Sequence, residues 1–435
     1  MKSSLKIGMI GFGNIGTGVV RALAQNEDIL KGRLPQGMEL ARITDVDTQT
    51  HRDAPYDSAL FSDDTDALLD DPEINVVVEL TGTIEPARTF IERALKAGKH
   101  VVTANKALIA LHGGELIRIA VDNDVCLLFE AAVGGGIPVI RTMHNGLASN
   151  DIVAVRGIIN GTANYILTRM GQDGLAFQEA LDEAQELGYA EPDPTFDIEG
   201  HDTAHKLAIL ASLAFGQDVR FEDVYREGIT NITAQDISYA AEIGYAIKLL
   251  GIAKRMGDGR IEARVHPTLL PDHGRLASVN GVFNAIRIDG NLTGSVILSG
   301  RGAGAEPTAS AILSDLMVLA SGKAEGGLRR EMRLSLPFEE KAVAPIDDLS
   351  MCYCIRFGML DVAGALAQVL TVLGKHGVSI NSMKQPPESA SHEYTNVMVT
   401  TQETQESNLQ NAMQEIQKLD VIRTEPFVMR IEQMG

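Results

Sequence analysis

Short apolar runs alternate with helix-like stretches over the first third of the chain. The runs lie at residues 5–10, 39–44, 74–80, 99–103 and 125–130, and helical patterns separate several of them. This alternation is typical of a parallel sheet whose faces are covered by helices. The first part of the chain therefore predicts an α/β domain of the Rossmann type.

The pattern changes near residue 150. Residues 160–255 are mostly helical in character, whereas residues 260–300 contain several strand-like segments. We expect an α+β domain here, with helices covering one face of a sheet.

A linker and a compact unit follow. The linker, expected at 336–350, contains Pro337, Pro345 and several charges. The unit has the order βαββαβ, which is typical of a ferredoxin-like module, with its elements at 352–357, 362–376, 378–384, 393–400, 406–418 and 422–432. The expected domains are thus residues 1–140, 141–335 and 351–435, with a helix near 305–330 that can pack back on the first.

Length and composition limit the class of protein. The 435 residues allow two or three domains of roughly 100–200 residues, and 45% hydrophobic with 22% charged residues is ordinary for a globular protein. The net charge of −20 argues against nucleic acid and anionic membranes as partners. No apolar run reaches the roughly 18 residues of a membrane helix, and because a strand-like segment starts at residue 5 we expect no signal peptide. Three cysteines form neither a disulfide framework nor a metal-ligand spacing, so we expect a reduced, cytoplasmic protein: Cys126, Cys352 and Cys354.

A glycine-rich turn follows the first apolar run and precedes a helix that we expect to open with Thr17. In a GxGxxG turn the first glycine permits the bend, the second lets the backbone approach a pyrophosphate, and the third lets helix and strand pack closely. The helix N-terminus then holds the phosphates. A purely structural turn is the alternative, but the flanking elements favour a dinucleotide site at Gly11, Phe12, Gly13, Asn14, Ile15 and Gly16.

Polar residues follow the next three strand-like runs, where ligands of an open parallel sheet bind. Asp45 suits the ribose hydroxyls of NAD, although a loop at 31–38 places it further along the chain from the glycines than usual, and Arg42 is a competing signal for NADP. We expect NAD. Thr81 and Lys106 follow the third and fourth runs and are expected near the nicotinamide, but a lysine in such a position is as often a solvated loop residue.

The segment 187–206 carries acids and a lysine in a pattern that a solvated surface does not explain. A turn containing prolines holds four acids, namely Glu191, Asp193, Asp197 and Glu199. A helix is expected to start near Gly200, and on it Asp202 and Lys206 share one face. That face continues through the apolar Ile209, Leu210 and Leu213. Lys206 should therefore point inward, where a lysine needs a carboxylate partner and is often functional. An ordinary exposed ion pair is the alternative.

Several motifs together resemble the homoserine dehydrogenase family. They are GFGNIG at 11–16, TANK at 103–106, EAAVGGGIP at 130–138, NGTANYI at 160–166, and GYAEPDP at 188–194 with the DxxxK helix after it. The resemblance covers residues 1 to about 340. The tail, with Asp361 and Gly364 at its first strand–helix junction, resembles an ACT regulatory domain.

This resemblance implies reversible, nicotinamide-dependent reduction of L-aspartate 4-semialdehyde to L-homoserine, on the pathway to threonine, methionine and isoleucine. By motif, Lys206 corresponds to the proton donor, Asp202 to its partner, and Lys106 to a second lysine near the reacting oxygen. The chemistry agrees, because hydride delivery to an aldehyde builds negative charge on its oxygen, which cationic or protonic groups stabilise.

Further residues are implied by the same resemblance. Glu191 and Asp197 would bind or position the ammonium group of the substrate, in a pocket that also includes Gly161 and Tyr189. The family has a sodium site beside a hinge. Here it would be formed by Glu130, Val133, Gly135 and Ile137, although the three glycines 134–136 suit a plain hinge equally well.

Cofactor choice and regulation follow from the resemblance as well. Val46 stands where NADP-using relatives often have a basic residue, which favours NAD over NADP. The ACT domain would bind an end product of the pathway, for which we expect threonine, at Asp361, Gly364 and Asn381. A dimerisation module without a ligand is the alternative. In either case we expect a homo-oligomer, a dimer or a tetramer.

Three other functions compete with this one. An acylating aldehyde dehydrogenase needs an activated cysteine, but no cysteine follows a strand at a turn into a helix. Another NAD(P)-dependent hydroxy-acid dehydrogenase would usually show arginines for the substrate carboxylate near its base. A non-catalytic, NAD-responsive amino-acid sensor has no need of an inward-facing Lys206 with four acids nearby.

Overall fold

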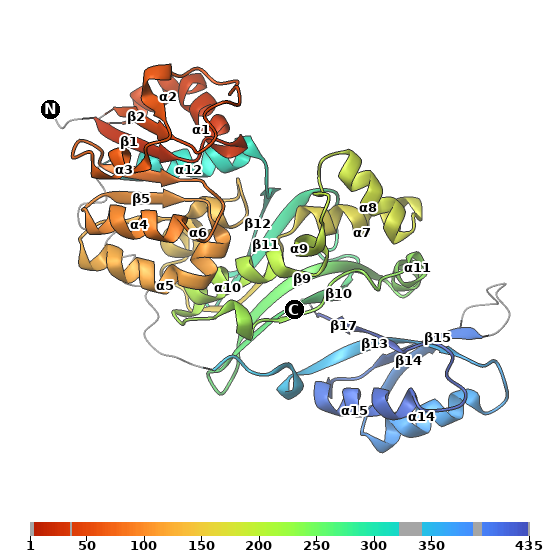
Figure 1. The fold of residues 1–435 in the computed structure, drawn as a ribbon. Coiled ribbons are helices and arrows are strands. Elements are labelled where there is room, and N and C mark those ends of the chain that lie inside the picture. Colours follow the sequence, from red (N-terminus) through yellow and green to blue (C-terminus); the bar gives the residue numbers. More distant parts are fainter. Residues whose placement is uncertain (1–3, 35–36, 322–341, 386–393, 434–435) are drawn as a thin grey trace.

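The structure is a computed structural model, and it describes residues 4–34, 37–321, 342–385 and 394–433. Figure 1 shows an N-terminal part in red and orange, a central part in yellow and green, and a C-terminal part in blue. The predicted fold class, a Rossmann-type domain followed by an α+β domain and a ferredoxin-like unit, is confirmed. Among the helices of the described residues, none is long and apolar enough to cross a membrane.

The N-terminal part is a six-stranded parallel sheet with the order β3-β2-β1-β4-β5-β6. The strands are β1 (Leu5–Ile10), β2 (Met38–Thr44), β3 (Phe61–Ser62), β4 (Val76–Glu79), β5 (His100–Thr103) and β6 (Leu127–Leu128). The helices are α1 (Asn14–Gln25), α2 (Glu27–Arg33), α3 (Thr65–Asp70), α4 (Ala87–Lys96) and α5 (Lys106–Asp122). The strand order reverses between β1 and β4, which is the switch point where such sheets bind ligands.

Three details of this domain differ from the sequence-based expectation. Helix α1 begins at Asn14 and not at Thr17, because the second half of the glycine turn already belongs to its first turn. Much of the loop expected at 31–38 lies in α2 or at the start of β2. The run at 125–130 yields a strand of two residues, after which Glu130 starts a short 3-10 turn.

The central part combines a sheet with helices on one side. Its elements are α6 (Val139–Arg141), β7 (Ile152–Ile158), α7 (Gly161–Asp173), α8 (Phe177–Glu186), α9 (Thr195–Ile198), α10 (His201–Phe215), β8 (Tyr225–Arg226), α11 (Ala234–Glu242), β9 (Tyr245–Arg255), β10 (Ile261–Pro271), β11 (Phe283–Gly290) and β12 (Gly294–Arg301). The expectation that residues 245–255 are helical was wrong, since they form β9. Residues 247–253 are buried without a break, and such a run lacks the alternation that distinguishes a strand from a helix.

Helix α12 (Ala305–Ala320) leaves the central part and packs against α1 of the N-terminal part. The contact is close because Gly18 has no side chain. A Cβ placed there would lie 3.1 Å from the Cβ of Ala305. The remainder of the helix expected near 305–330 lies outside the described residues.

The C-terminal part has the elements β13 (Ser350–Met359), α14 (Ala365–Lys375), β14 (Ile380–Lys384), β15 (Thr395–Thr401), β16 (Thr404–Gln405), α15 (Glu406–Ile416) and β17 (Phe427–Ile431). It has its own hydrophobic cluster, which includes Tyr353, Phe357, Val369 and Leu409. Strand β17 nevertheless pairs in parallel with β10, Thr268 opposite Arg430, so the sheets of the central and C-terminal parts are continuous.

The expected linker 336–350 is described from residue 342 onward. Val343 forms a parallel bridge with Ile261, and the amide of Ala344 donates to the carbonyl of Ile261. A 3-10 turn (Ile346–Asp348) then leads into β13. The described end of the linker is therefore attached to the first residue of β10.

Candidate active site

Asp202 and Lys206 both lie on α10 with buried side chains, as the sequence predicts. Helix α10 packs against α5, β7 and β9, and it is buried over most of its length. Gly200 precedes it in the left-handed conformation, φ +79°, which L side chains rarely adopt. Lys206 is 7% exposed and Asp202 2% exposed. The apolar stripe predicted this burial correctly.

Asp202 lies between two lysines. Its Oδ2 accepts from Lys206 Nζ at 2.6 Å, and its Oδ1 is 2.5 Å from Lys106 Nζ. Lys106 is the first residue of α5, and its side chain lies over the ring of Phe196. The fold thus unites two lysines that are one hundred positions apart around one carboxylate, which the sequence pattern alone does not establish.

The charges of this group have clear physical causes. Burial raises the pKa of Asp202, but the two lysines more than offset it, so the pKa lies below its usual range and the carboxylate is ionised. Burial lowers the pKa of Lys206, and Asp202 opposes this only in part. Lys106 is less buried, so the carboxylates of Asp202, Asp197 and Glu191 prevail over burial and raise its pKa.

Two acids of the 187–206 turn border this group. Asp197 lies on α9, and its Oδ1 accepts from Asn160 Nδ2 at 2.6 Å. Burial and the negative charge of Asp202 raise the pKa of Asp197. Glu191 is exposed and acts electrostatically on Lys106. Asn160 was not singled out from the sequence, although its position between a strand and a helix is a signal for an N-cap.

The other expected substrate residues lie next to α7. Gly161 is the first residue of α7, and a Cβ there would lie 3.0 Å from the carbonyl oxygen of Val282. Tyr189 is 44% exposed and packs against the ring of Tyr165. The carbonyl of Tyr189 accepts from Thr162 Oγ1 at 2.7 Å. The turn is therefore attached to the helix that starts beside Asn160.

The glycine turn has the geometry of a dinucleotide loop. Gly11 has φ +99°, and a Cβ on Gly16 would lie 2.4 Å from the carbonyl oxygen of Gly11. A Cβ on Gly13, by contrast, would meet no atom within 4 Å, so this backbone faces open space. These are the three separate roles of the motif. Asn14 and Ile15 form the first turn of α1.

Asp45 and Thr81 lie on either side of this loop. The Oδ2 of Asp45 accepts from the backbone amide of Phe12 at 2.6 Å, and Val46 beside it is 96% exposed. Thr81 donates its amide and hydroxyl to Glu79 Oε1, both at 2.7 Å. Glu79, which is fully buried and also accepts from Thr103 Oγ1, was missed by the sequence reasoning.

The segment expected to bind sodium is mostly buried and contacts α12 and the end of β12. Both carboxylate oxygens of Glu130 accept backbone amides, from Ile140 at 2.9 Å and Arg141 at 2.8 Å. The carbonyl of Ile137 accepts from the amide of Val139. Gly135 has φ +54°, and Val133 is fully buried. In the described ranges no group of three or more His, Cys, Asp or Glu side chains could hold a metal, so a site here would depend on carbonyl oxygens.

The expected effector residues do not meet within one chain. Asp361 and Gly364 lie in the turn between β13 and α14, after Met359, which pairs with Thr395. Asn381 lies in a bulge of β14, between Ile380, which pairs with Thr401, and Ser382, which pairs with Thr400. Thr400 in turn pairs with Cys354 of β13. Met359 and Cys354 are five residues apart along β13, which is about 17 Å at ~3.4 Å per residue. The turn with Asp361 and Gly364 is therefore separated from Asn381 by that length of strand.

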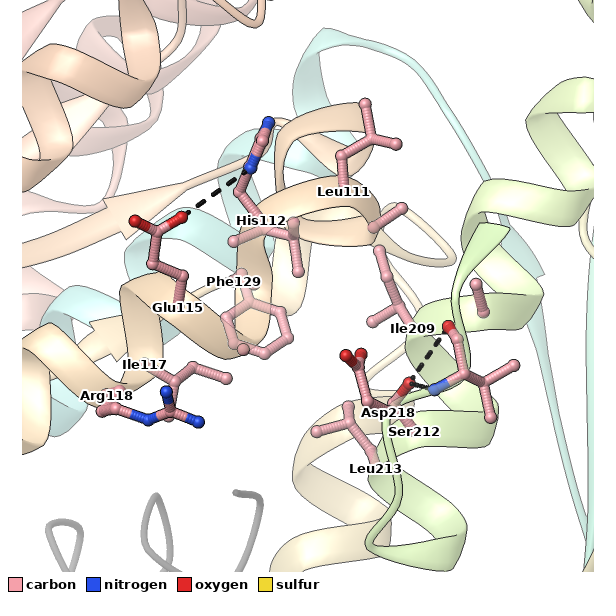
Figure 2. Close-up of a pocket in the computed structure, with 16 residues that line it drawn as sticks. Leu111, His112, Glu115, Ile117, Arg118, Phe129, Ile209, Ser212, Leu213 and Asp218 are labelled. Carbon is pink, nitrogen blue, oxygen red and sulfur yellow. Dashed lines mark hydrogen bonds and ion pairs between the residues drawn. The ribbon is translucent and has the colours of Figure 1, made fainter. Parts of the chain in front are cut away.

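A separate hollow of about 270 Å³ lies farther along α5 and α10. Figure 2 shows its lining, in which His112 faces Glu115. The hydroxyl of Ser212 accepts a hydrogen bond from the backbone amide of Val219 at 3.0 Å. Lys106, Asp202 and Lys206 do not line it. It is therefore distinct from the catalytic candidates. A cysteine nucleophile is also disfavoured, because Cys126 is buried and burial raises the pKa of Cys354 to about 12.

Comparisons with known proteins agree with this geometry. A family model described as homoserine dehydrogenase matches residues 138–317, its NAD binding domain matches 11–130, and an ACT domain matches 355–421. The homoserine dehydrogenases of Pseudomonas aeruginosa and Bacillus subtilis are 40% and 36% identical, each over 99% of both chains.

Solved structures show the same relationship. The crystal structure of a homoserine dehydrogenase from Thiobacillus denitrificans has a TM-score of 0.91 and 38% identity, covering 100% of this chain and 99% of its own. A hyperthermophilic archaeal homoserine dehydrogenase in complex with NADPH has a TM-score of 0.60 and 26% identity, over 74% of this chain and 98% of its own. The resemblance inferred from the motifs is confirmed, and the chain belongs to the homoserine dehydrogenase family of nicotinamide-dependent oxidoreductases acting on a CH–OH group, with an ACT domain at its C-terminal end.

Proposed function

We propose that this chain interconverts L-aspartate 4-semialdehyde and L-homoserine at the Lys106–Asp202–Lys206 group, on the pathway to threonine, methionine and isoleucine. The observation that carries the proposal is the buried carboxylate of Asp202 between two ammonium groups, 2.5 and 2.6 Å away. A single ion pair would be neutral. Two lysines with one carboxylate leave a positive charge for an oxygen that becomes negative during hydride transfer.

The residues divide the work by their electrostatics. The nicotinamide supplies or accepts the hydride, and the protein orients and polarises the substrate. Lys206, whose pKa is lowered by burial, gives up its proton more readily than an ordinary lysine and is the donor to the developing alkoxide. Lys106, whose pKa is raised by its carboxylate neighbours, keeps its charge and stabilises that oxygen. Asp202 holds both Nζ atoms in place.

Absorbance at 340 nm tests this activity directly. Homoserine with NAD or NADP should give a rise in absorbance that requires both reactants. 4-Hydroxybutyrate, which lacks the ammonium group, should react far more slowly because Asp197 and Glu191 have no cation to bind. Equal rates with the two alcohols would contradict the assigned substrate.

Glu191→Gln should raise KM for homoserine with little change in kcat. The substitution removes the negative charge near Lys106 and keeps the shape of the exposed side chain. Loss of binding that is equal in ground and transition states appears in KM alone. Steady-state kinetics at saturating cofactor measure this, with Glu186→Gln on the neighbouring α8 as the control. A fall in kcat at unchanged KM would assign Glu191 to the chemical step.

NAD preference is proposed from the end of β2. Asp45 presents a carboxylate beside the glycine turn, and the exposed Val46 offers no positive charge for a 2′-phosphate. Asp45→Ser together with Val46→Arg should therefore shift the ratio of kcat/KM towards NADPH. Kinetics with NADH and NADPH on both proteins measure the shift. A wild-type enzyme that already prefers NADPH tenfold would refute the proposal.

Sodium would bind at Glu130 and the carbonyls of Val133, Gly135 and Ile137. Support comes from the buried carboxylate of Glu130 and from the positive φ angles of Gly134 and Gly135, a tight backbone turn that glycine permits. The ion would fix the connection between the first and second domains and take no part in hydride transfer.

We further propose that the ACT domain binds threonine and that the chain forms a homo-oligomer. Pairing of two copies would allow Asp361 and Gly364 of one to approach Asn381 of the other, which one chain does not achieve. The outer strand β12, much of it exposed, gives a sheet edge on which copies can associate.

The effector signal has a physical route to the substrate site. Arg430 of β17 is buried and forms ion pairs with Glu406 at 2.7 Å and Glu227 at 2.8 Å. Just after Glu227, the amide of Ile229 donates to the carbonyl of Ile198, the last residue of α9. Helix α9 carries Asp197. A movement of β17 would thus reach the acid that is proposed to bind the substrate ammonium.

A further inference from the structure

Asn160 lies between Asp197, which is proposed to bind the substrate ammonium, and the Lys106–Asp202–Lys206 group. It follows β7, is 5% exposed and is the N-cap of α7. The preceding residue, Ile159, accepts a hydrogen bond from Lys206 Nζ at 2.7 Å. The two residues after β7 therefore contact different groups: Ile159 binds the proposed proton donor, and Asn160 binds the carboxylates.

The amide of Asn160 uses all its hydrogen-bonding groups. Its Oδ1 accepts from the backbone amide of Ala163 at 2.8 Å. Its Nδ2 donates to Asp197 Oδ1 at 2.6 Å and to Asp202 Oδ2 at 2.9 Å. The orientation is fixed, because a flipped amide would turn its oxygen towards two carboxylates and leave the Ala163 amide facing an NH₂ group.

This single nitrogen holds two like charges close together. Asp202 is one of the causes that raise the pKa of Asp197, after burial, and the hydrogen bond from Asn160 opposes both. Asp202 also accepts from Lys206 through the same oxygen that Asn160 contacts. Without this amide, the ionised form of Asp197 would be less stable, and Asp202 would lose one hydrogen-bond donor.

We propose that Asn160 is a positioning residue that keeps Asp197 ionised and aligned with Asp202, so that the ammonium end and the reacting end of the substrate are held in fixed register. The role rests on the proposed function, since it requires a substrate with an ammonium group. It predicts that Asn160 selects for amino alcohols and contributes through binding more than through the chemical step.

Two variants separate this role from helix capping. Serine is also a good N-cap acceptor, so Asn160→Ser keeps that bond and loses the two donors to carboxylates. KM for homoserine should rise about tenfold or more, as expected for a lost hydrogen bond to a charged group. The acid limb of the pH profile, where kcat/KM falls as the pH is lowered, should shift to a pH about one unit higher. Asp197 must be ionised to bind the substrate, and its pKa rises when a hydrogen-bond donor is removed.

Controls use the same chemistry elsewhere. Asp64→Ser changes the N-cap of α3, whose side chain accepts from Ala67 at 2.8 Å, and should leave KM and the acid limb unchanged. In an Asp197→Asn background, Asn160→Ser should no longer shift the acid limb, because the titrating carboxyl is gone. Asn160→Asp retains the cap but adds a third carboxylate, and should move the limb further than serine does.

The outcomes are distinct. If the acid limb of the Asn160→Ser enzyme is the same as that of wild type, the proposal is overturned. This holds even if kcat/KM and Tm fall, because Asn160 would then have a structural role only. Should that variant prove unstable, the profile of Asn160→Thr, which also keeps a capping oxygen and lacks the amide donors, decides in the same way. Wild-type enzyme without homoserine-dependent reduction of NAD or NADP would refute the proposed function itself.

Discussion

Lys206→Ala is expected to lower kcat by roughly 10²–10⁴-fold, the usual contribution of a general acid or base. The reason is geometric: Asp202 and the carbonyl of Ile159 hold Lys206 Nζ in one position, and the substitution removes this proposed proton donor. Cofactor affinity should barely change, because the glycine turn is formed by β1 and α1. Steady-state kinetics with a fluorescence titration of NADH measure the two quantities.

Matched variants exclude loss of folding as the cause. Lys206→Met keeps much of the side-chain volume and should show the same loss of kcat. Lys99 is another buried lysine, which binds the carbonyls of Asp71 and Ile74 near the opposite end of the nucleotide-binding sheet. Lys99→Met should keep kcat whatever it does to stability. If Lys206→Ala retains kcat within threefold of wild type, it is not the donor and Lys106 becomes the better candidate.

Saturating threonine is expected to change the apparent KM for homoserine by about 5–150-fold, the range of a coupling free energy of 1–3 kcal/mol. The effect should pass from the ACT domain through β17, whose Arg430 joins Glu406 to Glu227. Kinetics with and without millimolar threonine measure it. Enzyme that ignores threonine would leave the ACT domain as a dimerisation module.

Full-length variants are the right controls for this response. Ending the chain near residue 345 would remove β17, which pairs with β10, and would leave Arg264 without Glu432. Asp361→Ala changes an exposed turn residue outside the catalytic group and should abolish the response at unchanged basal activity. An Asp361→Ala enzyme that threonine still inhibits fully would contradict the assigned position of the effector.

Much of the site could be predicted from the sequence because its contacts are local. Asp202 and Lys206 lie one helical turn apart, and the apolar stripe of α10 specifies which face is buried. The glycine turn is equally local. Lys106 was placed near the site only by its position after a strand, and its contact with Asp202 depends on the packing of α5 against α10.

The remaining features depend on long-range packing that carries no periodic signal. Asn160 contacts acids 37 and 42 positions away, and nothing in its neighbours indicates that pairing. Strand β17 joins β10 across 162 positions at Thr268 and Arg430. Strand β9 was misread because burial on both faces removes the alternation of strands.

The position of bound homoserine tests the central claim most directly. A crystal structure with homoserine and reduced cofactor, a pair that cannot react, should place the hydroxyl oxygen at hydrogen-bond distance from Lys206 Nζ, roughly 2.7–3.2 Å, and the ammonium group against Asp197 and Glu191. Homoserine bound in the hollow between α5 and α10 (Figure 2), or with its hydroxyl away from both lysines, would contradict the account.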